Sequence, residues 1–248
     1  MYSNRKNNIY PILSGALGVV TMVLRCGLYA AGLDEKNLLV PGHFLSLLVW
    51  ISFLVAAVVI GVEVLRKNVA QWKNTGIKSG FSGALGALVL AVAIGWSVFA
   101  QDVSFTVVEK LNRIVGILCV PCLLVIAFCR LKGLRPFFLC HGVVCVYFCA
   151  HLVMCYGSWS ANPQIQDYVF ATLACACVAL FAYQQTAMDV DMGNGKLQYA
   201  LGLLAGYLGI AATYGMESFW LYPAAGFWAL TNLVGPEAAQ RDFAGEES

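Results

Sequence analysis

Charged side chains are scarce in this sequence. They make up 11% of the 248 residues, whereas hydrophobic residues make up 60%. A soluble globular domain carries about 25% charged residues, which cover its surface, so the composition excludes an ordinary water-soluble protein. The apolar residues also lie in long runs, and a helix needs roughly 20 of them to cross a bilayer core of about 30 Å. We therefore expect an integral membrane protein in contact with a lipid bilayer.

Several functional signatures are also missing. The formal net charge is only +2, and this excludes the strongly basic surface that a nucleic-acid partner requires. The sequence contains no phosphate-binding glycine loop, no H-E-x-x-H zinc motif and no G-x-S-x-G nucleophile motif. These absences favour a non-enzymatic protein but leave enzyme activity open, and we predict neither a catalytic residue nor a cofactor. The ten cysteines lie in the apolar runs, where thiols serve as small hydrophobic fillers.

Eight apolar runs predict an all-α bundle of about eight transmembrane helices in a single membrane domain, residues 1–248. The eighth run is short and contains Pro223, so a re-entrant or interfacial helix is the alternative there. Thr106 and Glu109 have the spacing of a capping box before the fourth run, and Asn162-Pro163 is typical of a helix start. The predicted segments are residues 12–33, 44–65, 81–100, 107–131, 137–158, 162–189, 197–215 and 219–234.

One short motif occurs twice. Residues 14–18 and residues 82–86 both read Ser-Gly-Ala-Leu-Gly, and each copy begins an apolar run that leaves the same side of the membrane. Parallel internal repeats are an established transporter architecture, and the motif suggests a duplication of four helices, with halves 1–131 and 132–248. The alternative is a chance match between glycine- and alanine-rich helices.

Basic residues predict the orientation. Eight spans divide them into eleven on the side of the N-terminus and three on the other side, with Arg25 inside the first run. Lysine and arginine concentrate in cytoplasmic loops, so both termini are expected in the cytoplasm. The eleven are Arg5, Lys6, Arg66, Lys67, Lys73, Lys78, Arg130, Lys132, Arg135, Lys196 and Arg241, and the three are Lys36, Lys110 and Arg113.

Arg25 is the most conspicuous single residue. It lies about two thirds of the way along the first run, in the outer half of the membrane, where a charge costs at least about 2.5–3.5 kcal/mol. Such a residue faces the bundle interior and finds a partner. The functional interpretation is an anion or carboxylate contact, and the structural interpretations are an ion pair or snorkelling toward the outer interface. If Arg25 binds a solute, Arg25→Leu should abolish solute binding.

Other polar residues share the level of Arg25 and are candidate substrate-binding residues with it. Their convergence depends on helix packing, which the sequence does not determine. They are Asn112, Arg113, His151, Asp167, Tyr168 and Glu217.

Two further patterns have open interpretations. His141 and Cys145 are one helical turn apart and form a two-ligand corner for a soft metal, but a complete site needs ligands from other helices, and we predict no metal. Gly202 and Gly206 form a G-x-x-x-G motif, which permits close helix packing either inside the bundle or between two copies in a homo-oligomer.

Part of the sequence resembles a known group of proteins. Trp159-Ser160 and the run Pro-Gln-Ile-Gln-Asp-Tyr at 163–168 resemble a stretch in uncharacterised multi-pass membrane proteins of Clostridia-type bacteria, with the similarity concentrated in residues 156–188. The resemblance implies a bacterial cytoplasmic membrane and no particular activity.

Two classes of function remain open at this stage. Arg25, the polar residues at its level and the repeated motif favour a transporter or channel for a small solute or ion. Small loops and the absence of a soluble domain are equally compatible with a membrane sensor, accessory or interaction protein that transports nothing.

Overall fold

The structure is a computed structural model that describes residues 9–32, 43–66, 80–100, 106–159, 168–213 and 220–234. These residues form eight helices and no strand, which confirms the predicted all-α bundle. Six of the eight, α2 to α7, are long and apolar enough to cross a membrane. The helices are α2 (Ile9–Ala31), α3 (Phe44–Arg66), α4 (Gly80–Ala100), α5 (Val107–Leu131), α6 (Phe138–Trp159), α7 (Val169–Asp189), α8 (Gly195–Ala211) and α9 (Leu221–Leu233).

The predicted capping box is confirmed at the start of α5. The backbone N–H of Glu109 donates to the Thr106 hydroxyl at 3.4 Å, and the Thr106 N–H donates to the Glu109 carboxylate at 3.3 Å. These bonds satisfy backbone donors that a helix start leaves without intrahelical partners. The predicted helix start at Asn162-Pro163 lies outside the described residues.

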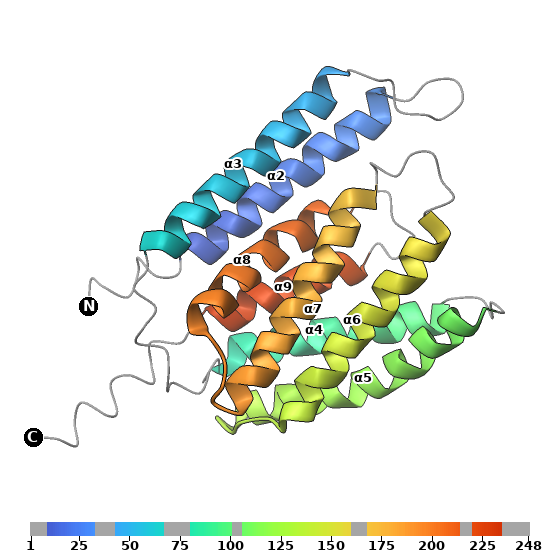
Figure 1. Ribbon diagram of the computed structural model, residues 1–248, viewed down its shortest axis with the longest axis vertical. Coiled ribbons are helices and arrows are strands. Elements are labelled where there is room, and N and C mark those ends of the chain that lie inside the picture. The colour runs from blue at the N-terminus through green and yellow to red at the C-terminus, as the bar shows by residue number, and fades with distance from the viewer. Residues whose placement is uncertain are drawn as a thin grey trace, which may run out of the picture.

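Six helices pack in a ring. Each of α4 to α9 contacts the next one along the chain, and α9 returns to contact α4. The α2–α3 hairpin lies outside the ring against α8 (Figure 1). Successive helices run in opposite directions, so that α3, α5 and α7 end where α4, α6 and α8 begin (Figure 1). We call this end the basic end, because Arg66, Arg130, Lys132, Arg135 and Lys196 lie on it.

The two shortest helices are the most enclosed. α8 has 17 residues and α9 has 13, and most of their side chains are buried against α2, α4 and α7. In contrast, α3 leaves large apolar side chains such as Phe44, Leu54 and Leu65 exposed. Apolar residues exposed along long apolar helices are typical of lipid contact. The fold is therefore that of a multi-pass membrane protein whose core helices are shielded by longer ones.

Glycines hold α8 and α9 together. A Cβ atom at Gly209 would lie 2.7 Å from the carbonyl oxygen of Tyr222 and 2.8 Å from the Cα atom of Gly226, and one at Gly206 would overlap the Leu230 side chain. Without side chains there, the two backbones approach closely. The G-x-x-x-G motif of Gly202 and Gly206 therefore serves packing inside the bundle.

The repeated pentapeptide makes the same kind of contact twice. The Ser14 hydroxyl donates to the Leu203 carbonyl of α8 at 2.8 Å, and the Ser82 hydroxyl donates to the Val234 carbonyl after α9 at 3.1 Å. The last glycine of each copy also lies against a core helix: a Cβ at Gly18 would meet the Tyr207 carbonyl of α8, and one at Gly86 would meet Thr231 and Trp228 of α9. Each copy thus packs its helix onto a core helix. Duplication of the two whole halves stays a prediction.

Candidate functional site

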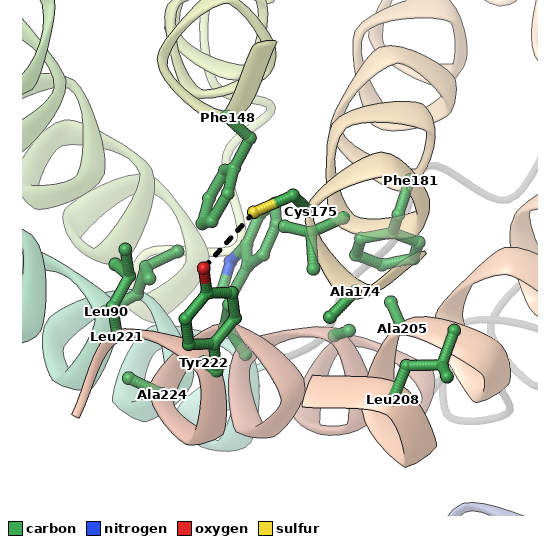
Figure 2. Close-up of a cluster of buried hydrophobic side chains, with 14 of the residues drawn as sticks. Leu90, Phe148, Ala174, Cys175, Phe181, Ala205, Leu208, Leu221, Tyr222 and Ala224 are labelled. Carbon is green, nitrogen blue, oxygen red and sulfur yellow. Dashed lines mark hydrogen bonds between the residues drawn. The ribbon is translucent and has the colours of Figure 1, made fainter. Parts of the chain in front are cut away.

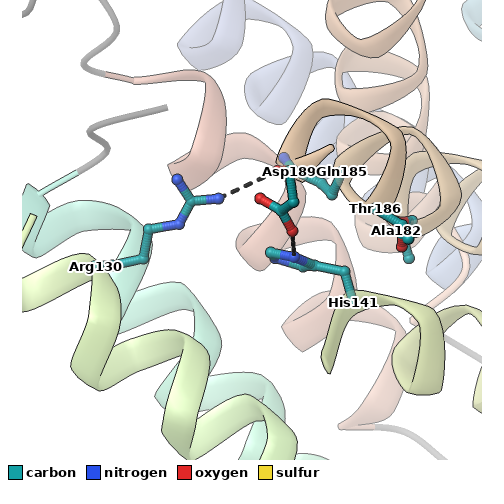
Figure 3. A network of polar contacts seen from close by, with 6 residues as sticks. All are labelled: Arg130, His141, Ala182, Gln185, Thr186 and Asp189. Atoms are coloured by element: carbon teal, nitrogen blue, oxygen red, sulfur yellow. Dashed lines mark hydrogen bonds and ion pairs between the residues drawn. The ribbon is translucent and has the colours of Figure 1, made fainter. Parts of the chain in front are cut away.

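Three buried polar side chains and one partly exposed carboxylate meet near the basic end of the ring (Figure 3). A short connection between α5 and α6 brings Arg130, in the last turn of α5, near His141, in the first turn of α6. Gln185 and Asp189 lie one turn apart at the end of α7, and side chains at i and i+4 share one helix face. We call Arg130, His141, Gln185 and Asp189 the Asp189 cluster.

A histidine–carboxylate pair forms one half of the Asp189 cluster. Nδ1 of His141 lies 2.6 Å from Oδ2 of Asp189. An ionised carboxylate only accepts hydrogen bonds, so this contact assigns the proton to Nδ1 when Asp189 is ionised. The imidazole is fully buried and stacks on the indole of Trp228, with ring centroids 6.3 Å apart. Its other nitrogen, Nε2, has no hydrogen-bond partner among the described atoms.

A buried cation forms the other half. Arg130 is 3% exposed, and its Nη2 donates to Oε1 of Gln185 at 3.2 Å. The Asp189 carboxylate lies close enough to attract the guanidinium electrostatically. With neutral His141, the cluster holds one positive and one negative charge, and this balance offsets the large cost of burying either charge alone.

A second ion pair on the same end contrasts with the Asp189 cluster. Arg135 and Asp191 meet at 2.9 Å, but their side chains are 49% and 59% exposed. Water screens an exposed pair, and it contributes about 0–1 kcal/mol. Asp191 is therefore a matched control for Asp189, two residues away along the chain.

Another set of buried polar groups, the His151 cluster, lies farther along the ring interior. Nε2 of His151 is 3.5 Å from Sγ of Cys155, and its Nδ1 has no partner among the described atoms. The Tyr147 ring stacks on His151, with centroids 5.9 Å apart, and the Tyr222 ring lies 6.1 Å away. The cluster consists of Ser97, Tyr147, His151, Cys155, Cys175 and Tyr222.

The hydroxyls and thiols of the His151 cluster connect four helices. The Tyr147 hydroxyl on α6 lies 3.3 Å from the Ser97 hydroxyl on α4. The Cys175 thiol on α7 donates to the Tyr222 hydroxyl on α9 at 3.9 Å, in the contact drawn in Figure 2. Both clusters therefore belong to the interior of the six-helix ring.

Arg25 belongs to α2 and is buried against α7 and α8. It is 3% exposed, its Nη1 donates to the Ala211 carbonyl at 2.7 Å, and its guanidinium lies 4.9 Å from the centre of the Phe170 ring. Ala211 is the last residue of α8, where carbonyls lack intrahelical partners and the helix dipole is negative. Arg25 thus provides a hydrogen-bond donor for a backbone carbonyl at the end of the core helix α8.

This geometry predicts that Arg25→Met destabilises the protein. The change keeps most of the side-chain volume but removes a hydrogen bond from a charged donor, a bond that contributes about 1.5–3 kcal/mol. We expect a lower midpoint of thermal unfolding in detergent. Arg66→Met, at an exposed position at the end of α3, is the control and should leave the midpoint unchanged. An Arg25→Met protein as stable as the wild type would contradict this role.

The other sequence-predicted residues have different surroundings. Asn112 is buried in α5, and its Oδ1 has no partner among the described atoms, while Arg113 beside it is half-buried. Tyr168 directly precedes α7, and its carbonyl accepts from the Thr172 hydroxyl at 2.9 Å. Asp167 and Glu217 lie outside the described residues.

The predicted convergence of these residues with Arg25 stays a prediction. The contacts of Arg25 lead to α7 and α8, whereas those of His151 lead along α6 and to α9.

The metal corner considered for His141 and Cys145 gains no further ligands from the part of the chain that the structure describes. Nδ1 of His141 is bonded to Asp189 and is therefore not free to bind a metal ion. Among the described residues, no group of three or more His, Cys, Asp or Glu side chains is arranged to hold a metal ion. All ten cysteines are free thiols within helices.

Sequence reasoning missed the Asp189 cluster. Arg130 was counted among the basic residues that predict the orientation, and neither Gln185 nor Asp189 was singled out. The usable signal was the placement of Gln185 and Asp189 one turn apart, with Arg130 inside an apolar run. The sequence does not show how α7 packs against α5 and α6.

Comparison with protein-family models, with curated proteins and with solved structures finds no match to this chain. A functional proposal therefore depends on the site itself.

Proposed function

We propose that this protein is a membrane ion transporter and that the ion it carries is the proton. The observation that supports the proposal is the contact between the buried His141 and the Asp189 carboxylate, which is 9% exposed, in helices that are long and apolar enough to span a membrane. Ionisable residues within membrane spans are expensive, and they commonly mark ion pathways and proton relays. Here they lie in the interior of the ring rather than on its lipid face.

The chemistry of the pair suits a proton. With Nδ1–H bonded to Asp189, the neutral imidazole keeps its lone pair on Nε2, which lacks a partner among the described atoms. A proton taken up at Nε2 makes the ring a cation, and the adjacent carboxylate compensates that charge. Histidine exchanges protons near neutral pH more readily than any other side chain. His141 is thus the proposed proton carrier, and Asp189 is the residue that orients it.

The orientation follows from the basic residues. If the positive-inside rule holds, the basic end with its Asp189 cluster faces the cytoplasm, and the N-terminus lies on that side. The resemblance at residues 156–188 supports a bacterial cytoplasmic membrane as the setting. Protons would then reach His141 from, or leave it to, the cytoplasmic side.

A protein without transport activity, such as a sensor or accessory subunit, is the second candidate. The contacts of Arg25 favour a protein without transport activity over a solute transporter, because the guanidinium packs on Phe170 and bonds to the end of α8. They equally disfavour Arg25 as the contact for an anionic solute. The Asp189 cluster favours proton transport over this alternative, and the two candidates predict opposite results in a flux assay.

The test is proton flux through the purified protein. The protein is reconstituted into liposomes that contain a pH-sensitive dye, and a potassium gradient with valinomycin sets a membrane potential. We expect the internal pH to change several-fold faster than in protein-free liposomes, and collapse of the potential should stop the change. The Asp191→Asn variant should behave like the wild type, because its carboxylate is exposed. Equal rates with and without protein would refute proton transport and favour the second candidate.

A further inference from the structure

The two histidines of α6 lie on one stripe of that helix. His141 and His151 are ten residues apart, which corresponds to about 15 Å along the helix axis. They are 0% and 1% exposed, and each has one ring nitrogen in a polar contact and the other without a partner among the described atoms. Val144 and Phe148, both fully buried, occupy the same stripe between them.

Helix α7 repeats this order. Cys175, in the His151 cluster, and Asp189 are fourteen residues apart, and Phe181 lies between them, fully buried. Phe181 packs edge-on against Trp228, with ring centroids 5.3 Å apart.

Helix α9 has the same arrangement. It contributes Tyr222 to the His151 cluster and Trp228 to the stacking on His141, with the buried Ala225 between them. On α6 and α7 a buried apolar residue thus lies between two polar positions, and on α9 Ala225 lies between two aromatic rings, one beside each histidine. Figure 2 shows Phe148 and Phe181 among buried hydrophobic side chains, near Cys175 and Tyr222 of the His151 cluster.

We infer that His151 is a second proton-binding station of this protein and that the layer around Phe148 and Phe181 separates it from the first. The inference rests on the proposed proton transport and names a further residue for it. Among the described residues, the ionisable groups in contact with His151 are Tyr147 and Cys155 on its own helix and Tyr222 on α9, and Cys175 on α7 bonds to Tyr222.

Each histidine returns to its neutral form after the proton has left it. A proton binds the free ring nitrogen of His151 and makes it a cation, and its departure restores the neutral imidazole. The same proton then binds Nε2 of His141, next to the Asp189 carboxylate, and leaves toward the basic end. A distance of about 15 Å exceeds the reach of a direct hydrogen bond, about 3 Å. Transfer therefore requires the apolar layer to admit water, and the layer limits the rate.

Two variants test the inference in the liposome assay. His151→Gln removes the proton-binding nitrogen and should reduce proton flux at least about tenfold. Phe148→Ala makes space in the apolar layer and should raise flux several-fold above that of the wild type. His43→Gln is the histidine control: His43 directly precedes α3, its Nδ1 accepts from the Leu45 N–H, and the variant should leave flux unchanged.

The outcomes separate the inference from the proposed function. If the wild type conducts protons and folded His151→Gln conducts equally well, the second station is refuted while proton transport stands. If His151→Gln does not fold, Phe148→Ala decides: higher flux supports the separating layer, and unchanged flux refutes it. If the wild type conducts no protons, both the proposed function and the inference fail.

Discussion

Asp189→Asn is expected to lower proton flux through the reconstituted protein at least about tenfold. The substitution preserves the size of the side chain and keeps an oxygen to accept from Nδ1 of His141, but it removes the negative charge. A protonated His141 would then be a second buried cation beside Arg130, and the Asp189 carboxylate would no longer compensate its charge. Loss of one partner of a buried ion pair costs about 3–5 kcal/mol, and each 1.36 kcal/mol corresponds to about a tenfold change in rate.

The control for Asp189→Asn is Asp191→Asn on the same end of the bundle. It removes the same charge from an exposed pair with Arg135, where screening limits the effect to about 1 kcal/mol or less. Both variants should elute as folded protein with the helical content of the wild type. Equal flux in folded Asp189→Asn and wild-type protein would exclude the carboxylate from the transport step.

The second large effect is expected from Gly209→Leu, in the packing of α8 against α9. Its Cβ would lie 2.7 Å from the carbonyl oxygen of Tyr222 and 2.8 Å from backbone atoms of Gly226. Backbone cannot rotate away as a side chain can, so the two core helices must separate. Overpacking of this kind costs typically about 1–3 kcal/mol and more where the neighbours are rigid. We expect a loss of stability at the upper end of that range or beyond, measured by thermal unfolding in detergent.

Gly61→Leu is the matched control for this substitution. Gly61 lies in α3, and a Cβ there meets nothing within 4 Å. Leucine at such a position would contact lipid and should leave the unfolding midpoint unchanged. If Gly209→Leu unfolds at the wild-type temperature, α8 and α9 are less closely packed than the structure indicates.

The stabilities of these variants also bear on function. Helix α9 supplies Tyr222 to the His151 cluster and Trp228 to the stacking on His141. A displaced α9 would move both aromatic rings away from the two histidines. We therefore expect Gly209→Leu to impair transport through folding, and this distinguishes it from Asp189→Asn, which should act on the folded protein.

The sequence was sufficient for the class of fold because that class depends on local composition. Long apolar runs predicted helices, and six of the helices found are long and apolar enough to span a membrane. The capping box at Thr106 and Glu109 was readable because both partners lie within one turn. The close packing of α8 could be expected from Gly202 and Gly206, since small residues at that spacing leave a smooth helix face.

The depth of Arg25 within its helix was also predictable, and so was the need for a partner. The identity of that partner was not, because the Ala211 carbonyl belongs to a helix 186 residues away in sequence. A backbone carbonyl cannot be identified as a partner from the types of side chain in the sequence. Arg25 was therefore expected near polar side chains, and the structure places it at the end of α8 and over Phe170.

The candidate site itself was decided by tertiary structure alone. Arg130, His141 and Asp189 each look ordinary in the sequence, as a basic helix end, a lone histidine and an acidic helix end. They become a charge-balanced cluster only because α5, α6 and α7 pack together at the same end of the bundle. Local composition thus determined that this chain forms membrane helices, whereas helix packing determined which of its few charged side chains meet, because contacts between distant segments have no local signature.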